Sequence, residues 1–206
     1  QSTFWHSSAH VLGQALEMHY GQDGEGAQGG GIGQYVRLCD GPALQPDDGM
    51  GGGFFYEMHL EGRATGSGKR ALSVSEDRDF KPLLKLAKQI AKSRQPFERL
   101  EVDRDVAARF FTCDGDAPGS FHNVFKLQML RRIPSEEQVS LYRCGPFVDL
   151  CRGPHLPHTG RIKAVSLTAC SASHWEGWEG EGGAPLLQRV YGVAFPSKPR
   201  LREWQE

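Results

Sequence analysis

The sequence has no excess of charge of either sign. Among its 206 residues, 24 Lys and Arg against 25 Asp and Glu give a formal net charge of −1. This balance excludes a broad basic surface, so a nucleic-acid partner would be held over a small local area. No apolar run approaches the roughly 18 residues that a membrane span requires. The N-terminus also lacks the basic and apolar blocks of a signal peptide, so we expect a soluble protein without a membrane partner.

Cysteines are few, odd in number and scattered. This distribution favours a reducing compartment over a disulfide framework and predicts a cytoplasmic location, with an organellar form left open. The segment "RATGSGKR" lacks the spacing of a phosphate-binding loop, so no ATP site is expected. The length allows one substantial domain. Because the sequence starts at Gln1 and stops in "LREWQE", we expect a piece of a longer protein.

Helical and strand patterns alternate without βαβ regularity, which predicts an α+β fold with a largely antiparallel sheet. The glycine-rich stretch 21–53 is interpreted as a partly mobile insertion that still contains a strand at 32–38. That strand and 54–60 form a predicted hairpin. The other predicted strands are 96–102, 161–170, 186–195 and two short ones around Gly145-Pro146. Predicted helices cover 3–20, 75–94, 105–111, 120–133 with Ser120 as N-cap, and 197–206 as the start of a linker helix.

Two histidines stand four residues apart in the first predicted helix, in "HSSAH". Apolar residues recur there at the helical period, and His6 and His10 lie on a neighbouring stripe about 100 degrees around. Both imidazoles should therefore project together from the edge of the buried face. Gly13, one turn further on, is expected to leave open space there.

A second pair with the same spacing, Cys151 and His155, occurs in "DLCRGPH", roughly 140 residues later. Three imidazoles and one thiol are the ligand types and number of a tetrahedral zinc site. Two alternatives stand beside this hypothesis. The pairs could lie on unrelated surfaces, or Cys151 could be the nucleophile of a Cys/His hydrolase, although the sequence assigns no acidic residue to orient its partner.

Five stretches carry a resemblance to a known family: "HSSAHVLGQALEMHYG", "GGFFYEM", "YRCGPFVDLCRGPH", "HTGRIKAVSL" and "LQRVYGVAFPS". Together they resemble the editing domain of threonyl-tRNA synthetases, which is shared in outline with alanyl-tRNA synthetases. The resemblance runs from Ser2 to about Trp204, so 1–206 is expected to form one tRNA-editing domain. "DLCRGPH" followed by "LQRVYGVAF" is of the threonyl kind, since alanyl-type domains carry a glycine-threonine step where this chain has Gly153-Pro154. The glycine-rich insertion is longer than the usual connection in that family.

The resemblance implies post-transfer editing. A pocket gains only roughly 1 to 3 kcal/mol from one methyl group, so a threonyl enzyme sometimes attaches serine. A second pocket then hydrolyses the smaller product and excludes threonine by its extra methyl. The implied activity is hydrolysis of the ester that joins serine to the 3′ end of threonine tRNA. The implied partners are that 3′ end and the remaining domains of the parent synthetase.

Matching motif to motif, the resemblance assigns His6, His10, Cys151 and His155 to the core of the editing site, and Lys126 in "VFKLQML" to the lysine that orients water or stabilises charge. It implies that His6 or His10 orients the attacking water with help from Lys126. Cys151 and His155 then shape the wall that senses the extra methyl.

Asp149 and Tyr56 are the implied substrate-binding residues, with Asp149 receiving the substrate's ammonium. Each has a plainer interpretation. Lys126 could be solvated on its helix, Asp149 could pair with Arg152 or Arg143, and Tyr56 could only pack its ring in the core. The remaining histidines, His19, His59, His122, His158 and His174, are interpreted as surface or satisfied interior residues.

Ligand chemistry and the family resemblance lead to different expectations about a bound metal. Ligand chemistry favours zinc at His6, His10, Cys151 and His155, whereas threonyl-type editing sites imply no required metal, which is the interpretation adopted. The alternatives are zinc-dependent, alanyl-type editing of seryl- or glycyl-tRNA for alanine, and a non-catalytic tRNA-docking module.

Overall fold

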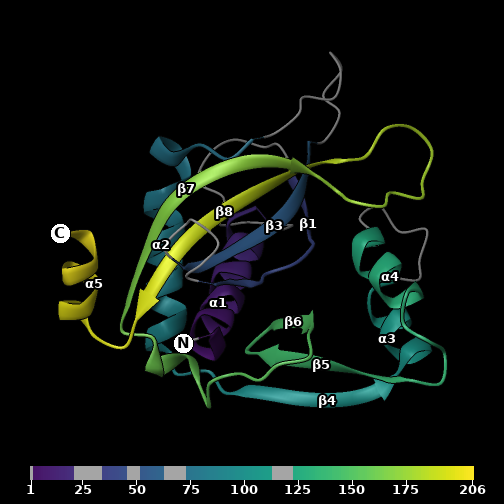
Figure 1. Cartoon of the computed structure of the whole chain (residues 1–206), viewed down its shortest axis with the longest axis horizontal. Coiled ribbons are helices and arrows are strands. Elements are labelled where there is room, and N and C mark those ends of the chain that lie inside the picture. The colour runs from purple at the N-terminus through teal and green to yellow at the C-terminus, as the bar shows by residue number, and fades with distance from the viewer. Residues whose placement is uncertain (1, 21–33, 46–51, 63–72, 113–122) are drawn as a thin grey trace.

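The structure, a computed structural model, describes residues 2–20, 34–45, 52–62, 73–112 and 123–206. Its larger sheet is antiparallel, in the order β1-β3-β8-β7, and β2 pairs with one end of β3. Helices α1 and α2 pack together beside this sheet (Figure 1). The bounds are β1 Gln34–Leu38, β2 Ala43–Leu44, β3 Gly53–Gly62, β7 Ala164–His174, β8 Leu186–Phe195, α1 Ser2–Tyr20 and α2 Glu76–Lys92.

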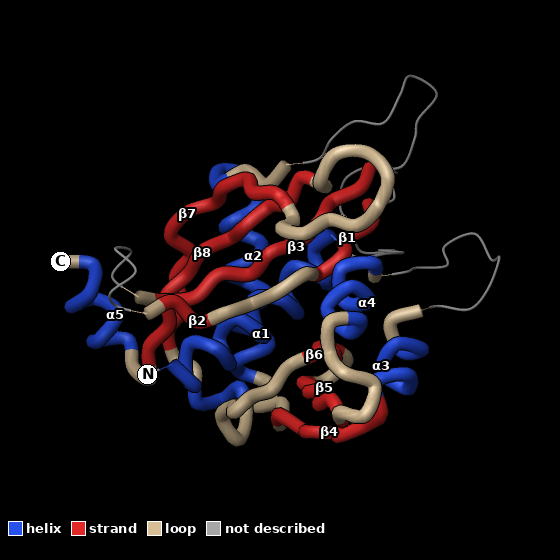
Figure 2. Tube along the Cα trace, turned by 45° about the vertical axis from the view of Figure 1, so that its right-hand side comes forward, coloured by secondary structure: helices blue, strands red, loops and turns tan. Residues whose placement is uncertain are grey.

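A second antiparallel sheet, in the order β4-β5-β6, forms a separate layer with helices α3 and α4 at one end. Both views show this layer on the opposite side of α1 from the larger sheet (Figures 1 and 2). The bounds are β4 Phe97–Asp103, β5 Gln138–Cys144, β6 Phe147–Leu150, α3 Arg104–Phe110, α4 Val124–Arg131, the short 3₁₀ helix η1 Thr159–Arg161 and α5 Lys198–Gln205.

The predicted class is confirmed: the fold is α+β, and every strand pair in the described residues is antiparallel. The strands form two separate sheets in the described residues, because β4, β5 and β6 pair only among themselves. Local sequence patterns indicate strands but not which strands pair over long distances. Part of the predicted insertion, 34–45, contains β1 and β2, while 21–33, 46–51 and the predicted loop 63–70 lie outside the described residues.

Helix α4 is shorter than predicted. It begins at Val124, and the side chain of Asn123 caps it by accepting a hydrogen bond from the backbone N–H of Lys126 at 3.2 Å. The predicted cap, Ser120, lies outside the described residues. Asn123 also donates its side-chain amide to the Leu38 carbonyl at 2.8 Å, so the cap ties α4 to the end of β1.

Helix α1 is buried on several faces because it lies between the two layers. On one side Trp5 donates its indole N–H to the Ala194 carbonyl of β8 at 3.2 Å. On another side His10 makes edge-to-face ring contacts with Phe97 of β4 and Phe147 of β6. The apolar stripe thus faces the larger sheet, and the histidine stripe faces the smaller one. Within the described residues, none of the helices combines the length and apolar character needed to cross a membrane.

Candidate functional site

The two distant pairs of the sequence meet in space. His6 and His10 from α1 and Cys151 and His155 from the segment after β6 bring their ligand atoms within 4.8 Å of one another. The Sγ atom of Cys151 lies 3.2 Å from Nε2 of His6 and 3.2 Å from Nε2 of His155. The alternative in which the pairs occupy unrelated surfaces is therefore wrong. We call these four side chains the Cys/His cluster.

His155 lies among other rings. Its imidazole stacks on Phe97 at 4.8 Å with an interplanar angle of 6°, and it meets Tyr142 edge-on at 4.5 Å. The rings of His10 and His6 are 4.2 and 4.5 Å away. Burial, followed by the neighbouring charges of His10 and His6, lowers the pKa of His155 to about 2. The ring is therefore neutral at physiological pH and a weak base.

Cys151 is a protonated thiol in this setting. Burial raises its pKa to about 12. The backbone N–H of Gly153 donates to Sγ at 3.2 Å and lowers the pKa, but by less than burial raises it. A nucleophilic cysteine needs a stabilised thiolate, usually beside an imidazolium. Here the thiol pKa is raised and the pKa values of His6 and His155 are lowered. The cluster thus disfavours the nucleophilic-cysteine interpretation.

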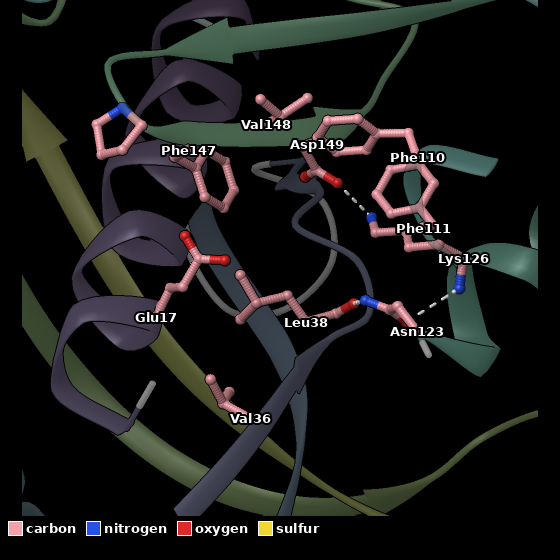
Figure 3. A pocket seen from close by; sticks show the side chains of 11 residues that line it. Glu17, Val36, Leu38, Phe110, Phe111, Asn123, Lys126, Phe147, Val148 and Asp149 are labelled. Carbon is pink, nitrogen blue, oxygen red and sulfur yellow. Dashed lines mark hydrogen bonds and ion pairs between the residues drawn. The ribbon is translucent and has the colours of Figure 1, made fainter. Parts of the chain in front are cut away.

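Lys126 and Asp149 form a buried ion pair next to the cluster. Their exposed fractions are 2% and 3%, and Lys126 points from α4 toward Asp149 on β6 (Figure 3). Burial alone would lower the pKa of Lys126 and raise that of Asp149, but each partner reverses the direction for the other, so both stay charged. The interpretation of Lys126 as a solvated side chain on its helix is therefore wrong. Asp149 pairs with neither proposed arginine, and Arg143 pairs with Glu98 at 2.8 Å instead.

Tyr56 packs its ring in the core and also contacts Asp149. Its ring is fully buried, and its hydroxyl donates to Oδ2 of Asp149 at 2.6 Å. The space beside Gly13, expected to be open, holds this ring: a Cβ on Gly13 would lie 2.6 Å from it, and one on Gly41 would lie 2.5 Å from it. Two glycines without side chains therefore fix where the tyrosine hydroxyl meets Asp149.

His10 links the cluster to the ion pair. It is 1% exposed, and its Nε2 lies 3.8 Å from Oδ2 of Asp149. Burial lowers the pKa of His10 to about 4 and outweighs the opposite effect of Asp149. His10 is therefore a neutral, interior ring that contacts both parts of the site.

This burial predicts an acid-labile fold. Below pH 6.5 the unfolded chain protonates His10, and the folded chain does so only near pH 4. The free energy of unfolding should therefore fall as the pH falls, by about 1.4 kcal/mol per pH unit over this window and about 3 kcal/mol in all from this ring. Urea unfolding at pH 7, 6 and 5 measures the slope.

His10→Gln should reduce the slope of the unfolding free energy against pH by the contribution of about one proton. His174→Gln, at an exposed histidine, is the matched control. Equal slopes for the wild type and His10→Gln would contradict the assignment.

A cavity of about 170 Å³ adjoins the ion pair. Lys126 and Asp149 border it together with apolar side chains from α3, β1 and β6 (Figure 3). No member of the cluster lines it, but His10 contacts two of its lining residues, Asp149 and Phe147. The lining residues are Glu17, Val36, Leu38, Phe110, Phe111, Asn123, Lys126, Pro146, Phe147, Val148 and Asp149.

Sequence reasoning missed three kinds of residue at this site. Asn123 positions Lys126 through the helix cap, Phe97 and Tyr142 enclose His155, and Ser7 contacts His155 directly. A cap-forming asparagine three residues before Lys126 was a detectable signal. Phe97 and Tyr142 follow from the pairing of β4 with β5, which local patterns do not reveal.

The other described histidines lie outside the cluster. His19 contacts Asp79 at 3.3 Å, and His59 contacts the Leu186 carbonyl at 3.0 Å. His122 lies outside the described residues.

The cluster also fits a zinc ion in its donor set. Ligand atoms of a tetrahedral site with Zn–N bonds near 2.0–2.1 Å and a Zn–S bond near 2.3 Å lie roughly 3.3–3.6 Å apart. The contacts of Cys151 with His6 and His155, at 3.2 Å, are close to this spacing. Ligand atoms 4.8 Å apart would have to approach by roughly 1.2–1.5 Å. His6, His10, Cys151 and His155 would hold the metal, which would polarise a bound water or carbonyl oxygen.

Comparison with known proteins matches part of this chain to a protein family. The family "Threonyl and Alanyl tRNA synthetase second additional domain" matches residues 139–191, which include all but the first residue of β5, the whole of β6, and the Cys151–His155 pair. The chain therefore contains the domain that these two classes of synthetase share.

Similarity along the whole chain is to the threonyl enzymes. Probable threonine–tRNA ligase 1, cytoplasmic, of Dictyostelium discoideum is 40% identical over 205 residues, which cover 100% of this chain and 23% of the relative. Threonine–tRNA ligase 2, cytoplasmic, of Homo sapiens is 35% identical over 206 residues, which cover 100% of this chain and 20% of the relative. Threonine–tRNA ligase, cytoplasmic, of Caenorhabditis elegans is 36% identical over 206 residues, which cover 100% of this chain and 23% of the relative. The chain belongs to the family of threonyl-tRNA synthetase editing-type domains. It spans about a fifth of these relatives, whose cytoplasmic names agree with the expected location.

Proposed function

We propose that this chain is the editing module of a threonyl-tRNA synthetase and hydrolyses the ester that links serine to the 3′ end of threonine tRNA. The observation that carries the proposal is the buried Lys126–Asp149 pair, which borders a small cavity and contacts the cluster of neutral imidazoles through His10. Ester hydrolysis requires a positioned water, a proton acceptor and positive charge near the oxyanion. The imidazoles supply the first two functions and Lys126 supplies the charge.

His6 is the proton acceptor that best suits this chemistry. A general base works best when its pKa lies near the working pH. Burial lowers the pKa of His10 to about 4 and that of His155 to about 2, which leaves both rings too weakly basic. Burial lowers the pKa of His6 as well, but Asp149, Asp40 and a hydrogen bond with Pro154 oppose the effect, and the ring is only partly buried. We therefore assign the attacking water to His6.

Asp149 can receive the substrate's ammonium while it keeps its present partners. Oδ1 faces Lys126, and Oδ2 accepts from Tyr56. A carboxylate has about four lone-pair sites, so acceptor capacity remains for an ammonium that arrives from the cavity. In this arrangement Lys126 lies beside the ester and stabilises its developing negative charge.

The cavity suits the aminoacyl end of a tRNA and not its body. Its volume of about 170 Å³ is smaller than the pockets of roughly 300–1,000 Å³ that hold drug-sized ligands. The net charge of −1 likewise gives no broad surface for nucleic acid. Other domains of the synthetase would hold the rest of the tRNA, since the chain spans only 20–23% of its relatives.

The direct test compares hydrolysis of serine-charged and threonine-charged threonine tRNA. The 206-residue chain, alone and within a threonine–tRNA ligase that carries it, should release serine at least tenfold faster than threonine, a ratio of the size that one methyl group provides. Serine release no faster than in buffer, in both forms of the protein, would refute the function and favour a tRNA-docking module.

The spacing of the Cys/His cluster supports a second candidate, zinc-dependent editing of the alanyl type. Metal analysis of the purified protein and the same hydrolysis assay after chelation separate the two. The metal-free mechanism predicts an unchanged rate on serine-charged threonine tRNA. Loss of activity on chelation, restored by zinc, together with a preference for serine-charged alanine tRNA, would establish the second candidate instead.

A further inference from the structure

Ser7, between the two histidines of α1, makes three polar contacts with its hydroxyl. The oxygen lies 2.8 Å from the Thr3 carbonyl, 2.9 Å from the backbone nitrogen of Leu156 and 3.1 Å from Nδ1 of His155. The side chain is fully buried at 0% exposure, so water takes no part in these contacts. Ser7 therefore connects α1 to the turn that carries His155.

The contacts are directional because a hydroxyl has one hydrogen and two acceptor sites. The carbonyl of Thr3 can only accept, so it takes the hydroxyl hydrogen. The N–H of Leu156 can only donate and occupies one acceptor site. The second acceptor site remains for His155, whose Nδ1 must then carry the hydrogen.

We propose that Ser7 is a positioning residue that selects the tautomer of His155, with the proton on Nδ1 and a free lone pair on Nε2. A neutral imidazole carries one proton, and the hydrogen bond made by one ring nitrogen determines the state of the other. Phe97 stacks on the ring of His155, and Tyr142 meets it edge-on. A half-turn of the ring would put carbon atoms in place of Nδ1 at Ser7 and of Nε2 at Cys151, so these two contacts fix the orientation of the ring. Neither the family match nor the sequence motif assigns a function to this serine.

The tautomer determines where the hydrogen of the Cys151 thiol goes. Sγ lies 3.2 Å from Nε2 of both His155 and His6. When Nε2 of His155 is unprotonated, it accepts the thiol hydrogen and leaves the lone pair of His6 available for water. If Nε2 of His155 carried the proton, it would donate to sulfur, and the thiol would have to donate to His6. This consequence rests on the proposed function, whereas the tautomer itself does not.

Nitrogen-15 NMR of the histidine side chains in the 206-residue chain tests the proposal, with His155→Asn used to assign the signals. In the wild type, Nδ1 of His155 should show a protonated nitrogen and Nε2 an unprotonated one. Ser7→Ala removes the acceptor from Nδ1, so the proton should move to Nε2, where sulfur can accept it. Ser8→Ala is the matched control: Ser8 is also buried in α1 and donates to the i−4 carbonyl of Phe4 at 2.9 Å, but it does not contact His155.

A wild-type His155 protonated on Nε2 overturns the proposal without any variant, even if Ser7→Ala fails to fold. Equal spectra for Ser7→Ala and the wild type overturn it as well. In the hydrolysis assay Ser7→Ala should lower kcat roughly tenfold with KM unchanged, the effect of one misdirected hydrogen bond, and Ser8→Ala should not. The expected tautomer together with no hydrolysis by the wild type would refute the proposed function and leave the assignment of Ser7 intact.

Discussion

Asp149→Asn is expected to lower the free energy of unfolding by about 3–5 kcal/mol, because it leaves a buried ammonium without its counter-charge. Lys126 and Asp149 are 2% and 3% exposed, so the hydration of the remaining ammonium is poor. The asparagine can still accept the hydroxyl of Tyr56, so that hydrogen bond does not account for the loss. Urea unfolding at pH 7 gives the value.

Two control variants make this prediction specific. Glu98→Gln breaks an exposed pair with Arg143, in which both side chains are at least half exposed, and should cost less than about 1 kcal/mol. The double variant Lys126→Met with Asp149→Asn removes both charges, keeps an acceptor for the Tyr56 hydroxyl and should recover most of the loss, because no buried ammonium is left without a counter-charge. A single Asp149→Asn variant as stable as the wild type would show that the pair is solvated.

The Cys/His cluster was predictable from sequence because two local patterns define it. The helical period places His6 beside His10, and the i, i+4 spacing recurs in Cys151 and His155. Their meeting in space did not follow from the spacing alone and depended on the resemblance to a family. The structure supplies the physical reason: α1 lies between two layers, and its histidine stripe faces the smaller one.

The ion pair and its surroundings were less predictable because they depend on contacts between distant segments. The sequence pattern of α4 shows a lysine near two arginines, which is typical of a solvated face, but Lys126 is buried by β1 and β6. The local sequence predicts open space beside Gly13, but the ring of Tyr56 from β3 fills that space. Contacts between helices and strands that are distant in the sequence determine both outcomes, and neither leaves a local signal.

His6→Ala is expected to lower kcat for serine release by about 10²–10⁴-fold, the usual contribution of a general base, with aminoacylation by the intact ligase unchanged. His6 is the member of the site best suited to this test. Its ring is only partly buried, so the substitution leaves the buried ion pair in place. The measurement is single-turnover hydrolysis of serine-charged threonine tRNA, with unfolding in urea as the check on stability.

Cys151→Ala is the matched comparison, because it removes the same 3.2 Å contact from the sulfur side. A thiol with a pKa of about 12 is a poor nucleophile at neutral pH, so this variant should keep its rate on the seryl ester within about tenfold. Its smaller side chain should admit the extra methyl and increase release of threonine. If Cys151→Ala instead loses as much activity as His6→Ala while both remain folded, the thiol takes part in the chemistry, and His6 acts as its base and not as the base for water.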